Sequence, residues 1–253
     1  MTIVFIFIIG LCVGSFLNVL IDRLPKGENV LVGRSHCDFC KKNLRWYELI
    51  PLVSFLIQRG QCRRCHKKLS IQYPLVELLT AIGFTYLYMV LDYPLAAVIS
   101  YLVIFSSLLV IFMADLKFQI IPDSMVAVGS IAAVVRLTSI GGSIPYAGWT
   151  QFIFSAIGAS GFFYLLWLLT KGRGMGLGDS KLAFLLGFLL GFPSIIVALY
   201  VAFLTGAIVG VILIVKGKKS LKTKIPFGPF LILGFIAAAQ WTPQILHFWR
   251  NIF

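Results

Sequence analysis

The stretch YPLAAVISYLVIFSSLLVIFMA, residues 93–114, runs for 22 positions without a charged side chain. About 20 apolar residues in an α-helix cross the hydrocarbon core of a bilayer. Residues 2–21, TIVFIFIIGLCVGSFLNVLI, form a second such run. No positively charged segment precedes that second run and no small-residue cleavage site closes it, so we expect a retained membrane span rather than a signal peptide. Both runs predict a membrane protein.

The composition of the whole chain agrees with this prediction. Of its 253 residues, 59% are hydrophobic and 12% are charged, whereas soluble domains carry about 25% charged residues. The net charge of +13 could suggest a nucleic-acid partner. Eleven of the 22 basic residues, however, lie within residues 23–68, and the others flank apolar runs. Membrane topology explains that distribution, so we expect no nucleic-acid partner.

The number of spans follows from the lengths of the remaining apolar runs. Charge-free runs at 137–170 and 182–215 are too long for one straight crossing. We expect breaks at residues 141–145 (GGSIP) and 191–193 (GFP). The sequence then predicts an all-α polytopic membrane protein with about eight transmembrane helices and a small zinc-binding cytoplasmic loop domain. The spans lie near 1–21, 74–92, 95–115, 123–140, 150–170, 179–192, 194–215 and 228–246.

The distribution of basic residues predicts the orientation. If residues 23–73 face the cytoplasm, eight spans place 20 basic residues on that side and two, Arg136 and Arg250, on the other. Merging the sixth and seventh spans would move the basic residues of 216–224 outside, against the positive-inside bias. We therefore expect eight spans with both termini outside.

The loop between the first two spans contains two paired cysteine motifs. Cys37 and Cys40 form one C-x-x-C motif, and Cys62 and Cys65 form the other. Two such pairs complete a tetrahedral four-thiolate site, so we expect a structural zinc ion without an open catalytic position. Two disulfides are the alternative, but the expected cytoplasmic location disfavours them. We expect His36 and His66, which flank the motifs, to be bystanders, and Cys12 to be a buried apolar residue of the first span.

Two of the nine acidic residues occupy unusual positions. Asp115 ends the apolar run at 93–114, and Asp179 opens another within GMGLGDSKL, residues 174–182. Both fall on the cytoplasmic side of the expected topology, so they can meet at one depth, and ionisable groups at a membrane boundary are functional candidates. Two close carboxylates sharing one proton can perform aspartic-protease chemistry. The alternative for Asp179 is helix capping within a glycine-rich turn.

Glycines precede Asp179, and a third acid follows Asp115. Gly174, Gly176 and Gly178 remove side chains beside Asp179, which would let a substrate backbone approach it closely. Asp123 follows Ile121 and Pro122 and is expected to start the fourth span as a cap.

Six motifs in order resemble the bacterial type IV prepilin peptidases, membrane aspartic proteases of the GxGD type. Two of the six are described above, the paired C-x-x-C motifs and GMGLGDSKL at residues 174–182. The other four are sequence blocks elsewhere in the chain. They are GSFLNVLIDRLP (14–25), YPLVELLT (73–80), DLKFQIIPD (115–123) and IPFGPFL (225–231). The resemblance implies cleavage of the basic leader of prepilin and pseudopilin precursors after a glycine, at the cytoplasmic face of the bacterial inner membrane. It places the catalytic pair at Asp115 and Asp179.

The resemblance also implies N-methylation of the new N-terminal residue with S-adenosylmethionine. Glu48 and Glu77 are candidates for binding this cationic methyl donor. The expected organisation is a first transmembrane helix at 1–21, a methylase-associated zinc-knuckle domain at 22–73 and a seven-helix peptidase core at 74–253. Substrates would belong to type IV pili or to type II secretion, and the lipid bilayer is the remaining partner.

Two other functions compete with this interpretation. A transporter with a zinc-stabilised cytoplasmic loop would place polar residues and broken helices near mid-span, whereas the distinctive acids here lie at a span edge. A different GxGD intramembrane peptidase would cut within a substrate's span and would not methylate. Methyl incorporation after leader cleavage distinguishes the two peptidases.

Overall fold

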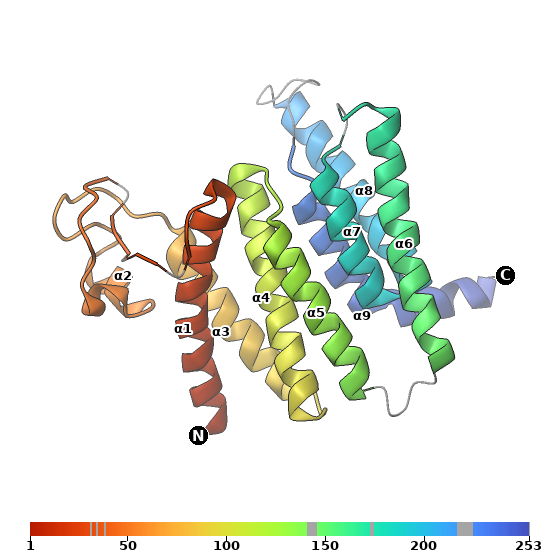
Figure 1. Cartoon of the computed structure of the whole chain (residues 1–253), viewed down its shortest axis with the longest axis horizontal. Coiled ribbons are helices and arrows are strands. Elements are labelled where there is room, and N and C mark those ends of the chain that lie inside the picture. The colour runs from red at the N-terminus through yellow and green to blue at the C-terminus, as the bar shows by residue number, and fades with distance from the viewer. Residues whose placement is uncertain are drawn as a thin grey trace. The chain divides into compact units, whose positions relative to one another are not determined.

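A computed structural model describes residues 1–30, 32–33, 35–37, 39–140, 146–172, 175–216 and 225–252. The described chain is helical (Figure 1). Its extended pairing consists of two isolated antiparallel bridges in the loop that contains the four cysteines. It divides into two compact units, Met1–Val110 and Ile111–Phe253. The expected break at 141–145, Gly174 and most of the basic segment 216–224 lie outside the described residues.

Six of the described helices are long and apolar enough to cross a membrane, which makes the protein a multi-pass membrane protein. They are α1 (Thr2–Arg23), α3 (Gln72–Val90), α4 (Leu95–Phe118), α5 (Asp123–Ile140), α6 (Tyr146–Leu169) and α8 (Ser194–Val215). Two further helices, α7 (Leu177–Leu190) and α9 (Gly228–Ile252), complete the set, so a helix lies over each of the eight expected spans. Many large apolar side chains of these helices are exposed, as is expected of surfaces that face lipid.

The sixth expected span differs from the others in length and burial. Helix α7 has 14 residues, a length of about 21 Å at 1.5 Å per residue, and falls short of a bilayer core. Nine of its 14 residues, spread over its whole length, are buried. Helix α8, by contrast, buries three of 22 residues. Because Leu177, Lys181 and Phe184 form the one exposed stripe of α7, the rest of the helix packs against other helices of unit 2. Gly191, with φ 70°, ends α7 where a break was expected.

Unit 1 is built on a close antiparallel contact between α1 and α3. A Cβ atom on Gly10 would lie 2.5 Å from the Cα of Ala81, and one on Gly14 would lie 2.6 Å from the Cα of Glu77. Small residues four apart let two membrane helices approach backbone to backbone. Cys12, on another side of α1, is exposed. The expectation that it is buried was wrong, because α1 turns only its glycine face toward α3.

Between α1 and α3 lies the cysteine loop, residues 24–71. It contains two short 3₁₀ helices, η1 (Leu24–Lys26) and η2 (Trp46–Leu49), and one short α-helix, α2 (Val53–Ile57). The two bridges, His36 with Asn43 and Gln61 with Lys68, each close one C-x-x-C motif.

In unit 2, α7 packs tightly on α6. A Cβ atom on Gly187 would lie 2.6 Å from the backbone oxygen of Ser155. The hydroxyl of Ser180 donates to the backbone oxygen of Ser160 at 2.9 Å, and the two hydroxyls lie 3.0 Å apart. These contacts fix the first turn of α7, which contains Asp179.

Candidate metal centre and acidic pair

The two cysteine motifs have the same local geometry. In the first, the N–H of Cys37 donates to the carbonyl oxygen of Lys42 at 3.1 Å, and the N–H of Lys41 donates back to Cys37 at 2.8 Å. In the second, Cys62 is joined to Lys67 and His66 in the same way, at 2.9 Å each. The residue after the second cysteine of each motif has a positive φ, 56° at Lys41 and 54° at His66. Each motif is therefore a tight turn that directs both of its sulfurs to one point.

The four sulfurs meet the geometry that a tetrahedral metal requires. One Sγ atom from each of the four cysteines lies within 4.8 Å of the others, and those of Cys37 and Cys65 are 3.8 Å apart. A zinc–sulfur bond of about 2.3 Å implies a sulfur–sulfur separation of about 3.8 Å at a tetrahedral ion. His36 and His66 are exposed and do not belong to the cluster. The cluster could hold a metal ion, and its donor set suits zinc.

The two buried sulfurs differ in acidity. Backbone N–H groups of Cys65 and Arg64 hydrogen-bond the Cys62 sulfur and lower the pKa of this thiol from 9.0 to about 7. Burial raises the pKa of the Cys37 thiol from 9.0 to about 11. A bound cation of charge +2 favours the thiolate form of every ligand, so metal binding would release protons from the cluster.

Asp115 lies in the last turn of α4 and is 5% exposed. Its Oδ2 accepts a hydrogen bond of 2.9 Å from the backbone N–H of Gly228, the first residue of α9. The first N–H groups of a helix have no partner within the helix and carry its positive dipole end. The N-terminus of α9 therefore stabilises a negative charge on Asp115.

Asp179 lies in the first turn of α7 and is 8% exposed. Its Oδ2 accepts a hydrogen bond of 3.2 Å from the backbone N–H of Gly176. It is close enough to Asp115 for the two carboxyl groups to interact electrostatically. Two helix N-termini thus converge on one pair of buried acids, each held by a backbone donor. The sequence analysis treated capping as the alternative to a catalytic role for Asp179; the hydrogen bond from Gly176 is a capping contact, and it occurs together with the proximity to Asp115.

Gly228 is a component of the pair that the sequence analysis missed. A Cβ atom at this position would lie 2.7 Å from Oδ2 of Asp115, so a side chain would displace the carboxylate. Phe227, beside it, packs on Phe203 of α8 and Phe163 of α6, with ring centroids 5.1 and 5.9 Å apart. This aromatic cluster fixes the start of α9. The IPFGPFL motif was the available signal, but it gave no indication of a contact 113 residues away.

The residues around the pair have more ordinary roles. Asp123 begins α5 and accepts two contacts of 2.7 and 2.8 Å from Lys181 at an exposed position. A Cβ atom on Gly178 would lie 3.1 Å from the Cβ of Ile121, so this glycine permits close packing of the chain. Gly176 is exposed, and the nearest side-chain atom to a Cβ built there is Oδ2 of Asp179, at 3.5 Å. Of the described glycines before Asp179, Gly176 is the one that lies against its carboxylate.

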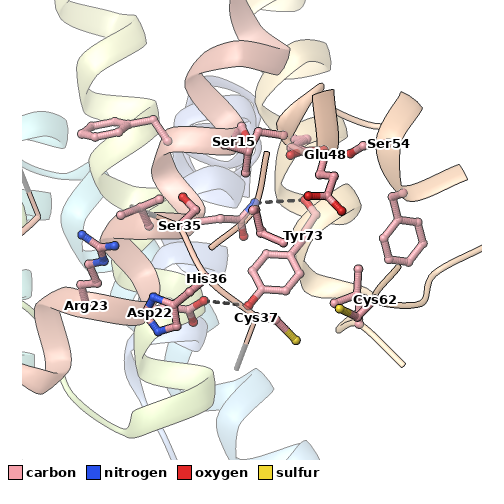
Figure 2. Close-up of a pocket in the computed structure, with 18 of the residues that line it drawn as sticks. Ser15, Asp22, Arg23, Ser35, His36, Cys37, Glu48, Ser54, Cys62 and Tyr73 are labelled. Carbon is pink, nitrogen blue, oxygen red and sulfur yellow. Dashed lines mark hydrogen bonds between the residues drawn. The ribbon is translucent and has the colours of Figure 1, made fainter. Parts of the chain in front are cut away.

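Unit 1 contains a cavity of about 360 Å³ between α1, the cysteine loop and α3 (Figure 2). Glu48 and Glu77, the sequence-derived candidates for methyl-donor binding, both line it, at 9% and 7% exposure. Oε2 of Glu48 accepts the N–H of Arg45 at 2.7 Å, and Oε2 of Glu77 accepts the N–H of Leu52 at 2.8 Å. The structure therefore brings these two carboxylates, 29 residues apart in the sequence, to one cavity.

Comparison with known proteins places these features in a family. The model of the bacterial peptidase A24 N-terminal domain matches residues 8–91, and that of the type IV leader peptidase family matches residues 102–211. A prepilin leader peptidase/N-methyltransferase of Bacillus subtilis is 33% identical over 248 residues, which cover 96% of each chain. The chain belongs to the type IV leader peptidase family.

Two further relatives are also named prepilin leader peptidase/N-methyltransferase. One from Myxococcus xanthus is 35% identical over 223 residues, covering 83% of this chain and 63% of that longer protein. One from Pseudomonas putida is 31% identical over 271 residues, covering 94% and 90%. No solved structure matches the chain.

The two family models coincide with the two candidate sites. The N-terminal domain of the A24 peptidases covers all four cysteines, Glu48 and Glu77. The leader peptidase model covers Asp115 and Asp179 and ends before Gly228. Within this family, therefore, the four-cysteine cluster and the acidic pair fall in separately recognised parts of the sequence.

Proposed function

We propose that this protein removes the leader peptide from prepilin and pseudopilin precursors and then N-methylates the residue exposed by the cut. The name of the relatives, prepilin leader peptidase/N-methyltransferase, supports both activities. The observation that carries the cleavage is the pair Asp115 and Asp179, two buried carboxylates held by backbone N–H groups at two helix N-termini.

The proposed cleavage uses these acids in unequal protonation states. Two close carboxylates cannot both ionise cheaply, so the pair holds one proton. The charged member takes a proton from a water molecule, whose oxygen attacks the scissile carbonyl carbon, while the protonated member donates a hydrogen bond to the carbonyl oxygen. Transfer of a proton to the leaving amine then breaks the C–N bond. The N–H groups of Gly228 and Gly176 hold the carboxyls in place throughout.

The methylation is assigned to the N-terminal part of the chain. S-adenosylmethionine would supply an electrophilic methyl group to the neutral α-amine of the shortened pilin, with S-adenosylhomocysteine as the leaving group and one proton released. The zinc-knuckle segment 22–73 is proposed as methylase-associated, with zinc bound by Cys37, Cys40, Cys62 and Cys65 as a structural ion. Residues 74–253 are proposed as the peptidase core.

The proposed location is the bacterial inner membrane, with the acidic pair facing the cytoplasm and both termini outside. The basis is the positive-inside distribution of the 22 basic residues. Prepilin leaders are basic and cytoplasmic, whereas the following pilin segment is an apolar helix in the bilayer. A scissile bond at that boundary would therefore meet acids that lie at the end of α4 and the start of α7.

Mass spectrometry of a prepilin incubated with the purified protein in detergent tests this proposal. With S-adenosylmethionine we expect loss of the leader and a gain of one methyl mass, and without it loss of the leader alone. Asp179→Asn and Asp115→Asn should yield neither product, because no new N-terminus appears. Asp123→Asn is the matched control and should cleave normally, since its partner Lys181 lies at the exposed surface.

The outcomes distinguish the alternatives. Cleavage without a methyl gain would leave a peptidase with a structural metal loop. Absence of cleavage with several prepilins, or full activity of Asp179→Asn, would contradict the proposed peptidase mechanism.

A further inference from the structure

The cavity of unit 1 collects acidic residues in a basic part of the protein. Of the nine acidic residues in the chain, four line this one cavity. They are Asp22, Glu28, Glu48 and Glu77. Arg23, Lys26 and Lys41 line it as well, so the wall combines both signs of charge. The two most buried of these acids, Glu48 and Glu77, are less than one-tenth exposed. Burying carboxylates is costly unless a cation or donor compensates them.

The described chain compensates only part of the negative charge of Glu48 and Glu77. Each of the two glutamates has one oxygen on a backbone N–H, and the Ser15 hydroxyl hydrogen-bonds Glu77. Each carboxylate keeps acceptor capacity beyond these contacts, because an ionised carboxylate can accept about four hydrogen bonds. Asp22 accepts the Tyr73 hydroxyl at 3.1 Å, as Figure 2 shows. The remaining acceptor capacity of the two glutamates suits a positively charged ligand.

Asn18 provides an independent sign of a ligand in the same wall. It is 4% exposed and lines the cavity. Its Nδ2 donates to the carbonyl oxygens of Tyr73 and Gly14 at 3.1 and 3.3 Å, which fixes the orientation of the amide. Its Oδ1 is buried and has no hydrogen-bond partner among the described residues. Buried polar atoms almost always have a hydrogen-bond partner, so we expect a donor that is not part of the described chain to bind this oxygen.

We propose that this cavity binds S-adenosylmethionine, with Glu48 and Glu77 facing its cationic groups and Asn18 Oδ1 accepting one of its hydrogen-bond donors. The proposal rests on the methylation given under the proposed function. The volume of the cavity, about 360 Å³, lies within the range of about 300–1,000 Å³ that small-molecule sites occupy. Phe16, Phe55 and Tyr73 provide apolar and aromatic surface for the adenine ring. Cys37 and Cys62 also line the cavity, so the metal cluster forms part of its wall.

Equilibrium dialysis of radiolabelled S-adenosylmethionine against the full-length, zinc-loaded protein in detergent tests the site. Glu48→Gln and Glu77→Gln each keep an oxygen for the backbone donor but remove the charge. We expect the Kd to rise about tenfold or more in each, as loss of a charge-assisted contact implies, with methyl transfer falling in step and prepilin cleavage at the wild-type rate. Asp92→Asn, an exposed acid outside the cavity, is the matched control and should bind normally.

A second measurement does not depend on the variants. Photo-crosslinking of labelled S-adenosylmethionine to the wild-type protein, followed by peptide mapping, should place the label on peptides within residues 15–23, 44–58 or 69–77. Label confined to residues 111–253, or unchanged affinity in both glutamine variants of a protein that methylates, would overturn the assignment of the cavity. A wild-type protein that cleaves prepilin but neither binds nor uses S-adenosylmethionine would instead overturn the proposed methylation itself.

Discussion

At the scale of single residues, scarcity is what makes the sequence informative. A chain with nine acids and five cysteines allows each one to be weighed, and Asp115, Asp179 and the two C-x-x-C motifs could be named without coordinates. The structure brings each of these sets together. Gly228 and Asn18 could not be named in this way, because their importance lies in a backbone N–H and an amide oxygen whose partners are decided by packing over long separations.

Gly228→Ala tests whether the backbone donor to Asp115 matters for the reaction. The added Cβ would lie 2.7 Å from Oδ2, so Asp115 must move or lose the 2.9 Å hydrogen bond. A displacement of that kind costs on the order of 100-fold in rate at a positioned catalytic group. We therefore expect prepilin cleavage in a timed assay to fall by about that factor while the protein still purifies as a folded species.

The matched control for Gly228→Ala is Gly158→Ala. A Cβ atom on Gly158 of α6 would have no neighbour within 4 Å, so this change alters composition in the same way without a steric conflict. Normal cleavage by both variants would show that the N-terminus of α9 does not hold Asp115 for catalysis.

At the scale of elements, the apolar runs predict where helices lie but not what covers them. The turn at 191–193 could be recognised from glycine and proline, which have defined conformational preferences. The difference between α7, a buried helix of 14 residues, and α8, with three buried residues, could not. Both read as apolar in the sequence, since lipid and a protein core select the same side chains. Helix α4 likewise continues to Phe118, which leaves Asp115 inside its last turn rather than at its end.

Gly10→Ala tests the α1–α3 contact. The new Cβ would lie 2.5 Å from the Cα of Ala81, and backbone atoms cannot move aside as a flexible side chain can. Overpacking of a tight interface costs about 1–3 kcal/mol. We expect a lower midpoint in thermal unfolding of the detergent-solubilised protein and weaker methyl transfer, since α1 and α3 both line the cavity.

Gly161→Ala on α6 is the matched control. Its Cβ would have no neighbour within 4 Å, so this variant should leave both quantities unchanged. An unaltered midpoint in Gly10→Ala would mean that the helices tolerate a wider spacing.

At the scale of the whole molecule, the two proposed activities use residues of different units. The four cysteines, Glu48 and Glu77 belong to Met1–Val110, whereas Asp115, Asp179 and Gly228 belong to Ile111–Phe253. Each unit has its own close helix contacts, formed by Gly10 and Gly14 in the first and by Gly187 in the second. The cysteine loop contains three helical segments of three to five residues, too short to be stable alone. We therefore expect the fold of this loop to depend on the proposed zinc ion more than the fold of the rest of the chain does.

Removal of the metal should consequently separate the activities. A zinc chelator, or Cys37→Ser, takes one or more thiolates from the four-sulfur site, and a structural zinc site contributes directly to the folding of the segment that binds it. Because Cys37 and Cys62 line the cavity with Glu48 and Glu77, loss of the cluster should open that cavity and abolish methyl transfer. The hydrogen bonds of Asp115 and Asp179 come from Gly228 and Gly176, so cleavage should persist. Atomic emission measures the metal content, and mass spectrometry of the same sample measures leader loss and methyl gain. Cys12→Ser, which changes an exposed thiol outside the cluster, should retain them all. Cleavage that disappears together with methylation would show that the metal supports the peptidase as well, and would contradict this division between the units.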